Sequence, residues 1–281
     1  MSGFWQAVFD PQIHFLRNAL IAGLLSCVAF GVVGSYVVVR RVSYLAGSIA
    51  HSVLAGIGFS LYARSVWGWT WLDPMEGALA AGFLSAVLVW WVSIRARERE
   101  DAVIGAIWSV GMGTGLLFLS CTPGYVDPMS YLFGDILLVG DGQMEAVAIL
   151  DVVVLAVGLV FFNRFKALSF DEEFCVVRGV SARVHSLLLL CLVAVTVVTL
   201  VSVVGIVLVI ALLTIPAAAA GKWARSLGGM MVGAMIVGLI SVPSGISLSF
   251  VFDLPSGPVV VIVLAAAYLV AWAFSPARRQ K

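Results

Sequence analysis

Most lysines and arginines in this chain lie in short polar gaps between long apolar runs. Of the 16 basic residues, 14 fall in the gaps at 40–44, 94–102, 163–185 and 221–227 and in the tail from residue 275. Positively charged loops stay on the cytoplasmic side when a helical membrane protein inserts. The pattern therefore predicts a multi-pass membrane protein, and it also predicts which loops a cytoplasmic partner can reach.

The composition excludes a water-soluble globular domain. Hydrophobic residues make up 62% of the 281 residues, charged residues make up 11%, and the mean hydropathy is +1.11. Soluble domains carry about 25% charged residues. The basic residues lie in separate loops and not on one face, so no nucleic-acid partner is expected. The four cysteines form no C-x-x-C pair, which argues against a disulfide framework or a zinc knuckle.

Nine apolar runs approach the length of about 20 residues that a helix needs to cross a bilayer. We predict an all-α, polytopic transmembrane helical bundle that forms a single domain over residues 1–281. The number of spans falls to eight if 45–63 or 206–220 enters the membrane without crossing it, because glycines interrupt the first run and Pro216 the second. The predicted spans are 15–39, 45–63, 75–93, 103–120, 145–162, 186–203, 206–220, 228–243 and 257–274.

Glycines recur at four-residue spacing in two of these runs, as Gly111/Gly115 and Gly229/Gly233. In lipid, such pairs allow helix backbones to approach closely. They favour a tightly packed bundle and are compatible with a second subunit.

With the basic gaps in the cytoplasm, the loops near 64–74, 121–144, 204–205 and 244–256 face outward, and nine spans place the N-terminus outside. An acidic outer mouth would attract cations over about 8 Å at physiological salt. The simpler interpretation, which we favour, is that acidic residues are merely tolerated on this side. The outward acidic residues are Asp73, Glu76, Asp127, Asp135, Asp141, Glu145 and Asp253.

Ionisable residues inside apolar spans are costly, so each is a candidate for function. His51 is the clearest, because a neutral imidazole binds zinc and several other first-row metals. A packing role is the commoner one for a lone histidine, and both interpretations stay open. Ser48 shares a helix face with His51. Asp151 either lines a pathway or points up to the outer interface, and we favour the interface.

The cytoplasmic loop 163–185 contains a predicted amphipathic helix. Its apolar positions have helical spacing, three acidic residues suit the positive end of the helix dipole, and Gly179 supplies a C-terminal cap. The helix either rests on the membrane surface or docks a soluble partner; its acidic start favours docking. The residues concerned are Phe170, Asp171, Glu172, Glu173, Phe174, Val177, Arg178 and Gly179.

No motif for energy conversion is present in the sequence. A P-loop needs G-x-x-x-x-G-K-[ST], and the one Gly-Lys pair, Gly221-Lys222, lacks the rest of it. A proton or sodium relay usually requires several intramembrane acids, and Asp151 is the single candidate. We therefore expect a transport subunit without its own ATPase motif that is driven by a partner.

Several segments, in order along nearly the whole chain, resemble the membrane permeases of bacterial ABC importers for zinc, manganese and iron. Residues 40–56 resemble a signature of that family, 169–180 its coupling segment, and 205–218 its late helix with a Pro-Ala run. Residues 131–137 and 253–258 also resemble family segments.

The resemblance implies a type II ABC importer-like permease of the bacterial inner membrane that works as a homodimer or heterodimer. It implies two cytoplasmic ATP-binding cassette subunits, an extracytoplasmic metal-binding protein, and alternating access of a divalent metal ion, with no permanently bound cofactor. It further implies an Asp/His metal site near His51, but this chain has Ser48 where the aspartate is expected. Losing an anionic oxygen ligand slightly favours zinc over manganese.

Three other functions remain open at this point. The first is a permease of the same architecture for a metal chelate. The second is a gradient-driven secondary transporter without an ATPase, and the third is a non-transport membrane scaffold. The predicted docking loop favours the ABC permeases.

Overall fold

The computed structural model describes residues 14–95, 100–124, 127–134, 136, 139–170, 175, 179 and 181–275. Within these ranges the chain forms helices and no strand, which confirms the all-α prediction. The helices are α2 (His14–Val39), α3 (Ser43–Val66), α4 (Pro74–Arg95), α5 (Glu100–Cys121), α6 (Pro128–Phe133), α7 (Asp141–Val160), α8 (Phe162–Phe170), α10 (Ala182–Val204), α11 (Ile206–Gly221), α12 (Leu227–Phe252) and α13 (Ser256–Ala273).

Each of the nine predicted spans corresponds to a helix. Eight helices of the described chain are long and apolar enough to cross a membrane, while α11 has only 16 residues. At about 1.5 Å per residue α11 covers roughly 24 Å, less than the roughly 30 Å of a hydrocarbon core. Most of its side chains are buried, and α2, α12 and α13 pack around it. Because protein surrounds α11, its short length is tolerated.

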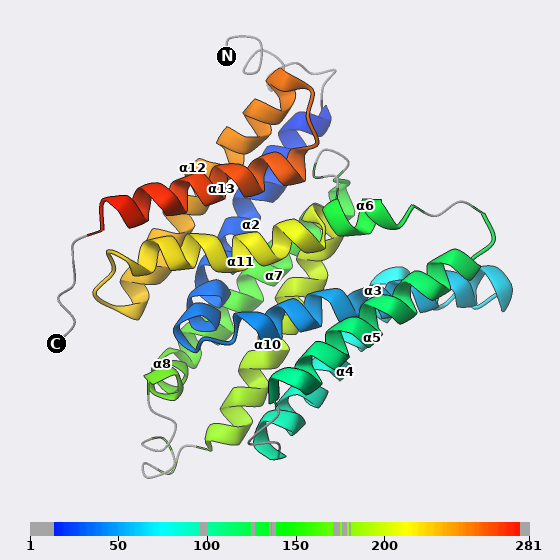
Figure 1. Ribbon diagram of the computed structural model, residues 1–281, viewed down its shortest axis with the longest axis horizontal. Coiled ribbons are helices and arrows are strands. Elements are labelled where there is room, and N and C mark those ends of the chain that lie inside the picture. Colours follow the sequence, from blue (N-terminus) through cyan, green and yellow to red (C-terminus); the bar gives the residue numbers. More distant parts are fainter. Residues whose placement is uncertain are drawn as a thin grey trace.

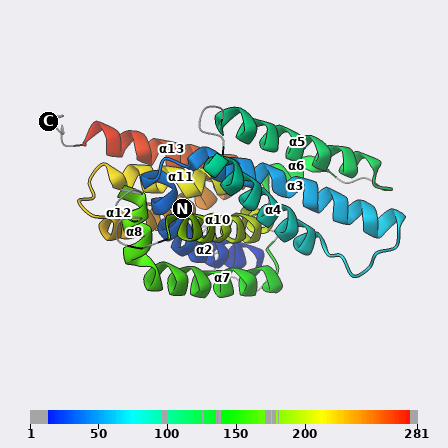
Figure 2. The same cartoon turned by 90° about the horizontal axis from the view of Figure 1, so that it is seen from below.

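The helices form two groups that lie side by side (Figure 1). In one group α3 packs against α4 and α5; in the other α2 packs against α7, α11 and α12, and α13 covers α11 and α12. Helix α10 contacts both groups. In the turned view α7 lies along one face and α5 and α13 along the opposite face (Figure 2). The most apolar window of α3 is 67% buried and that of α5 only 17%, so α3 is central and α5 is at the surface.

Glycines in α3 allow close packing and do not interrupt the helix. The suspicion that they break the span 45–63 is wrong, because α3 is continuous over 24 residues. A Cβ added at Gly56 would collide with the backbone carbonyl of Gly77 on α4, and one at Gly58 with that of Gly115 on α5. Two neighbours thus approach α3 at backbone distance, as small residues permit in lipid.

The close packing predicted from glycine pairs is confirmed for α5. Gly111 and Gly115 both face α3, where an added Cβ would collide with its atoms. In the second pair, Gly233 faces Ala220 of α11, whereas Gly229 lies in the first turn of α12. The structure therefore assigns close helix contacts to three of the four glycines.

Helix α12 is longer than predicted. The span 228–243 was expected to end at Pro243, but the helix continues to Phe252, and the predicted outward loop 244–256 shortens to 253–255. Proline is tolerated inside membrane helices where nearby hydroxyls and neighbouring helices satisfy the backbone. Helix α12 packs closely against α2, α11 and α13.

The turn between α10 and α11 consists of one glycine. Gly205 has φ +79°, and Gly134 at the end of α6 has φ +63°. Both lie in the left-handed region that favours glycine, and a Cβ on either would collide with the backbone of the other. Helix α6 is thereby held against this outward turn.

Two of the basic gaps meet at one end of the bundle, as the predicted topology requires. Arg40, just after α2, donates to the Ser186 hydroxyl near the start of α10 at 3.2 Å. Arg164 on α8 lies 3.4 Å from the imidazole Nε2 of His185 on α10. The gaps 40–44 and 163–185 therefore lie on the same side of the molecule.

Candidate functional site

His51 lies on the face of α3 that packs against α5. Its ring stacks on the indole of Trp108, with 4.4 Å between ring centroids and 18° between planes. The histidine is partly exposed, yet its Nδ1 atom is buried and has no hydrogen-bond partner among the described residues. A buried ring nitrogen without a partner costs free energy unless a ligand satisfies it, so His51 can offer a nitrogen to a metal ion.

Gly47 creates the space for this stacking. It lies one helical turn before His51, and a Cβ added there would stand 3.1 Å from the indole of Trp108. The indole therefore covers the face formed by positions 47 and 51. Any larger side chain at position 47 would require Trp108 to move.

Ser48 and Ser52 are used to hold α3 against α5. The Ser48 hydroxyl is fully buried and donates to the carbonyl of Ile104 at 3.2 Å. The Ser52 hydroxyl donates to the Ser48 carbonyl at 2.8 Å and to the Ile107 carbonyl at 3.3 Å. Because its hydroxyl donates a hydrogen bond to a carbonyl of α5, Ser48 contributes to helix packing in this conformation.

Asp151 lies apart from this face, on α7. Its side chain is only 7% exposed at the middle of a 20-residue helix, so the favoured interpretation that it points up to the outer interface is wrong. The carboxylate Oδ1 accepts a hydrogen bond from the backbone N–H of Ala29 on α2 at 3.2 Å, and Oδ2 has no partner among the described residues. Asp151 thus joins α7 to α2.

The described residues contain no group of three or more histidine, cysteine, aspartate or glutamate side chains that could hold a metal ion. His51 therefore lacks a complete ligand set from its own chain within these residues. Zinc sites generally use at least three protein ligands. A metal at His51 would need ligands from a second subunit, from water or from a chelating molecule.

The predicted docking segment lies largely outside the described residues, including Asp171, Glu172, Glu173, Phe174 and Arg178. The part that is described begins with α8, a helix that the sequence analysis did not predict separately. Phe170 ends α8 and is 68% exposed. Gly179 has φ +72°, the conformation that a C-terminal cap requires.

Side chains on both sides of this segment anchor it to the bundle. Cys175 is buried with Leu168 of α8 and Ala182 of α10. His185 Nδ1 lies 2.8 Å from the Ser181 carbonyl, and its Nε2 faces Arg164. The described ends of the segment, at Leu168 on α8 and Ala182 on α10, therefore lie close together.

Three of the six acidic residues described on the outward side, Asp73, Glu76 and Asp127, have structural partners. Asp73 forms an ion pair with Arg64 at 3.2 Å, and its backbone N–H donates to Glu76 at the same distance. Asp127 caps α6 by accepting from the N–H of Met129. These contacts support the simpler interpretation, in which the outward acidic residues are merely tolerated, over one in which they attract cations.

Sequence reasoning missed Trp108 and the amide of Ala29, although each is the main partner of a predicted residue. The signal for Trp108 was present but ambiguous, because a tryptophan in an apolar run is usually a packing residue. The Ala29 amide has no sequence signal, since every residue except proline has one.

Comparison with known proteins identifies the fold and the family. A solved structure of PsaBC from Streptococcus pneumoniae in complex with a Fab matches with a TM-score of 0.87 and 27% identity, covering 99% of this chain and 97% of that chain. A probable metal transport system membrane protein of Chlamydia trachomatis is 35% identical over 93% of this chain and 88% of its own length. The manganese transport system membrane protein MntC of Listeria monocytogenes is 31% identical over 94% of this chain and 92% of its own length.

The family assignment rests on almost the entire chain. The profile of the ABC 3 transport family matches residues 12–275, a range that includes His51, Trp108, Asp151 and the segment around Phe170. The predicted resemblance to ABC importer permeases is thereby confirmed. This multi-pass membrane protein belongs to the ABC 3 transport family.

Proposed function

We propose that the chain is the permease subunit of an ABC importer that carries a divalent transition metal ion across the bacterial inner membrane by alternating access. The observation that carries the proposal is the family match over residues 12–275. The names of the Chlamydia and Listeria relatives, a metal and a manganese transport system, support a metal as cargo. Two ATP-binding cassette subunits, an extracytoplasmic metal-binding protein and a second permease subunit complete the transporter.

The path of the metal passes the α3–α5 face at His51. Its unpartnered Nδ1 is the nitrogen that the cargo would meet. In this conformation Trp108 covers the face, so access requires α5 to shift against α3. Helix α5 is suited to such a shift because it lies at the surface of the bundle. Further ligands come from the second permease subunit or from water.

Ligand chemistry and the named relatives support different metals. The nitrogen of the His51 imidazole favours zinc, since manganese prefers oxygen ligands. The Listeria relative is named for manganese. Competition between the two ions for uptake by reconstituted transporter discriminates these alternatives.

ATP hydrolysis by the partner subunit is coupled to transport through its contact with the cytoplasmic segment 163–185. Phe170 is the exposed apolar side chain at the described end of α8, and the acidic residues that follow it suit docking to a soluble subunit. A Phe170→Asp or Phe174→Asp exchange should uncouple ATP hydrolysis from transport while the fold persists. Phe274→Asp is a matched control for the first exchange, because Phe274 is 72% exposed at the cytoplasmic end of α13. Normal coupling in the Phe170 and Phe174 variants contradicts the docking role.

A metal chelate is the second candidate cargo. It is supported by the incomplete ligand set around His51, because a chelate brings its own ligand atoms. A chelate importer would respond to the loaded chelate and not to the free ion.

The experiment that tests the metal path uses the transporter reconstituted with its ATPase. His51→Phe keeps an aromatic ring stacked on Trp108 but removes the ligand nitrogen, whereas His51→Ala removes both. We expect His51→Phe to lower metal uptake and metal-stimulated ATP hydrolysis at least about tenfold, with an unchanged elution profile and melting temperature. Normal uptake by His51→Phe together with a loss in His51→Ala would show that the ring only packs.

A further inference from the structure

A groove of about 230 Å³ lies between α7 and α12, with α2 as its floor. Both α7 and α12 pack against α2, and the buried side chain of Val32 on α2 lines the groove. Helix α7 contributes Leu155 and Leu159 to one wall, and α12 contributes Met231 and Met235 to the other. The groove is separate from the α3–α5 face that carries His51.

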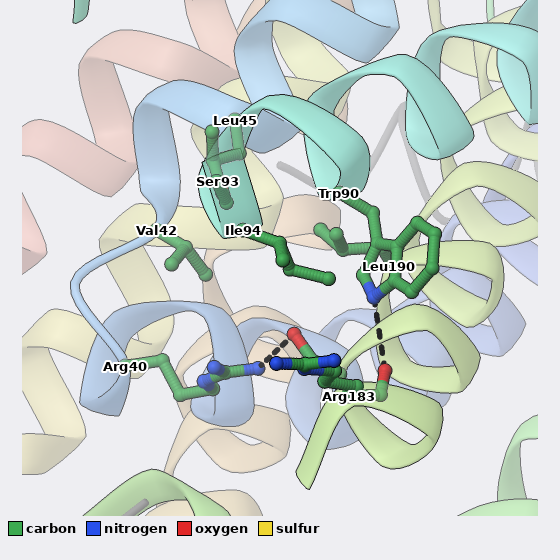
Figure 3. A pocket seen from close by; sticks show the side chains of 9 residues that line it. Arg40, Val42, Leu45, Trp90, Ser93, Ile94, Arg183 and Leu190 are labelled. Carbon is green, nitrogen blue, oxygen red and sulfur yellow. Dashed lines mark hydrogen bonds between the residues drawn. The ribbon is translucent and has the colours of Figure 1, made fainter. Parts of the chain in front are cut away.

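Its lining distinguishes this groove from a hollow at the predicted cytoplasmic ends of α2, α4 and α10. That hollow has the guanidinium groups of Arg40 and Arg183 on one side (Figure 3). Arg183 lies in the segment 163–185, to which we assign the docking of the ATPase, so that hollow belongs to the docking region. None of the described residues that line the groove carries a charged or hydrogen-bonding side chain. An ion or a metal chelate would lose its hydration there without compensation, which leaves an apolar ligand.

The groove lies at the depth of the inner leaflet. Phe162 is the first residue of α8 and Gly228 the second residue of α12, so both stand next to loops that are predicted to face the cytoplasm. Leu155 and Met235 lie about two helical turns further into the membrane, which is roughly 10 Å. Half of a hydrocarbon core measures about 15 Å, so the groove runs through most of one leaflet.

Glycines give the groove its shape. A Cβ added at Gly158 would stand 3.1 Å from Val32, so α7 lies close to α2 at this level. On the other side Met235 packs on Gly31 of α2, where an added Cβ would collide with it. No described atom lies within 4 Å of a Cβ built at Gly228, so space remains at the cytoplasmic end of the groove.

The groove opens on a face of the bundle that is directed toward lipid. Helix α7 lies along the face opposite to α5 (Figure 2). The proposed function places the second subunit near the α3–α5 face, because His51 needs further ligands there. At the edges of the groove, Leu159 is 72% exposed and Val232 is 57% exposed. The bilayer therefore covers the groove, and acyl chains are the apolar groups that it supplies.

We propose that this groove binds an acyl chain of a phospholipid from the inner leaflet. Water does not fill an apolar cavity, whereas a chain that enters gains van der Waals contacts with both walls. The flexible side chains of Met231 and Met235 adapt to such a chain. Because the described lining carries no charge, the groove recognises the chain and not the headgroup. The inference rests on the proposed function only for the side on which the second subunit lies.

The test is photolabelling of the full-length protein in its purified assembly, reconstituted in vesicles without metal or ATP. The probes are phosphatidylcholine and phosphatidylglycerol, each with a diazirine in the middle of one acyl chain. Mass spectrometry compares the label on residues 155–162 and 228–235 with that on Leu88, which is 41% exposed in the inner half of α4. The test variant is Gly228→Leu. The matched control is Gly105→Leu near the start of α5, because no described atom lies within 4 Å of a Cβ at either glycine.

We expect both probes to label the groove of wild type and control more strongly than Leu88. The Gly228→Leu variant should lose the groove label at least about fivefold, because the added side chain fills the space that the acyl chain needs. If this variant folds poorly, Val232→Phe, which narrows the groove from its edge, should give the same loss.

Three results would overturn the site: equal label on the groove and on Leu88, unchanged label in Gly228→Leu, or labelling that depends on the headgroup. A disulfide between two Leu159→Cys chains would overturn the acyl chain in favour of a second copy of this chain. The labelling needs neither metal nor ATP, so a failure of metal transport, which would contradict the proposed function, is measured separately.

Discussion

His51 and Asp151 are both ionisable residues in the middle of apolar helices, yet their surroundings differ. His51 is partly exposed at the α3–α5 face, stacks on Trp108 and keeps Nδ1 without a partner. Asp151 is buried between α7 and α2, where its Oδ1 is bonded to a backbone N–H of α2. The first residue has a ring nitrogen without a partner among the described residues, and the second joins two helices through a hydrogen bond. An ionisable residue in a membrane span therefore reveals its role through its partners and its access.

The largest effect should come from a substitution that disrupts the close packing of α5 against α3, the face that carries His51. Gly115→Leu would force a side chain into the backbone of α3 at Leu54 and should destabilise the protein by about 3 kcal/mol. Gly113→Leu is the matched control on the same helix, because nothing lies within 4 Å of a Cβ there. Thermal unfolding in detergent measures both. Equal stability of the two variants would contradict the α3–α5 packing.

The next effect concerns the chemistry of the His51 face. Replacing Gly47 by Asp together with Trp108 by Ala places a carboxylate one turn before His51 and removes the indole that blocks it. We expect the ratio of manganese to zinc uptake to rise about tenfold, because manganese prefers oxygen ligands. The control is Gly47→Asn with Trp108→Ala, which has the same shape without the charge. An unchanged ratio in the Asp variant means that the metal does not pass this face.

A smaller effect is expected at Asp151. Asp151→Ala removes the acceptor for the Ala29 N–H and should cost about 1 kcal/mol of stability, as interhelical hydrogen bonds in membranes do. Asp151→Asn keeps an acceptor oxygen and should cost less. Metal transport should persist in both variants. Loss of transport in a well-folded Asp151→Asn protein would instead make Asp151 part of the pathway.

The smallest effect is expected in the outward loop. Arg64→Gln breaks the ion pair with Asp73, in which both side chains are about half exposed, at 49% and 62%. Exposed pairs contribute about 0 to 1 kcal/mol, so melting temperature and transport should hardly change. A marked loss of transport would show that the outer acids guide the cargo after all.

The helices at the nine predicted spans could be predicted from the sequence because each depends on a local run of apolar residues, and eight of them are long enough to cross a membrane. The end of α12 was missed because the predicted span stopped at residue 243, whereas the helix continues through Pro243 to Phe252 and packs against α2, α11 and α13. His51 could be singled out because a histidine is rare inside an apolar run. The stacking of His51 on Trp108 could not be predicted, because that contact joins two helices far apart in sequence. The hydrogen bond between Asp151 and the Ala29 N–H could not be predicted for the same reason. Local patterns thus predict elements and candidates, while partners depend on tertiary packing.

The most direct test of the central claim is ATP-dependent metal accumulation in proteoliposomes that contain this chain, its ATPase and its extracytoplasmic binding protein. The account predicts that zinc or manganese accumulates against its gradient when ATP is hydrolysed, and that a proton or sodium gradient alone has no effect. Accumulation driven by an ion gradient without ATP hydrolysis would contradict it.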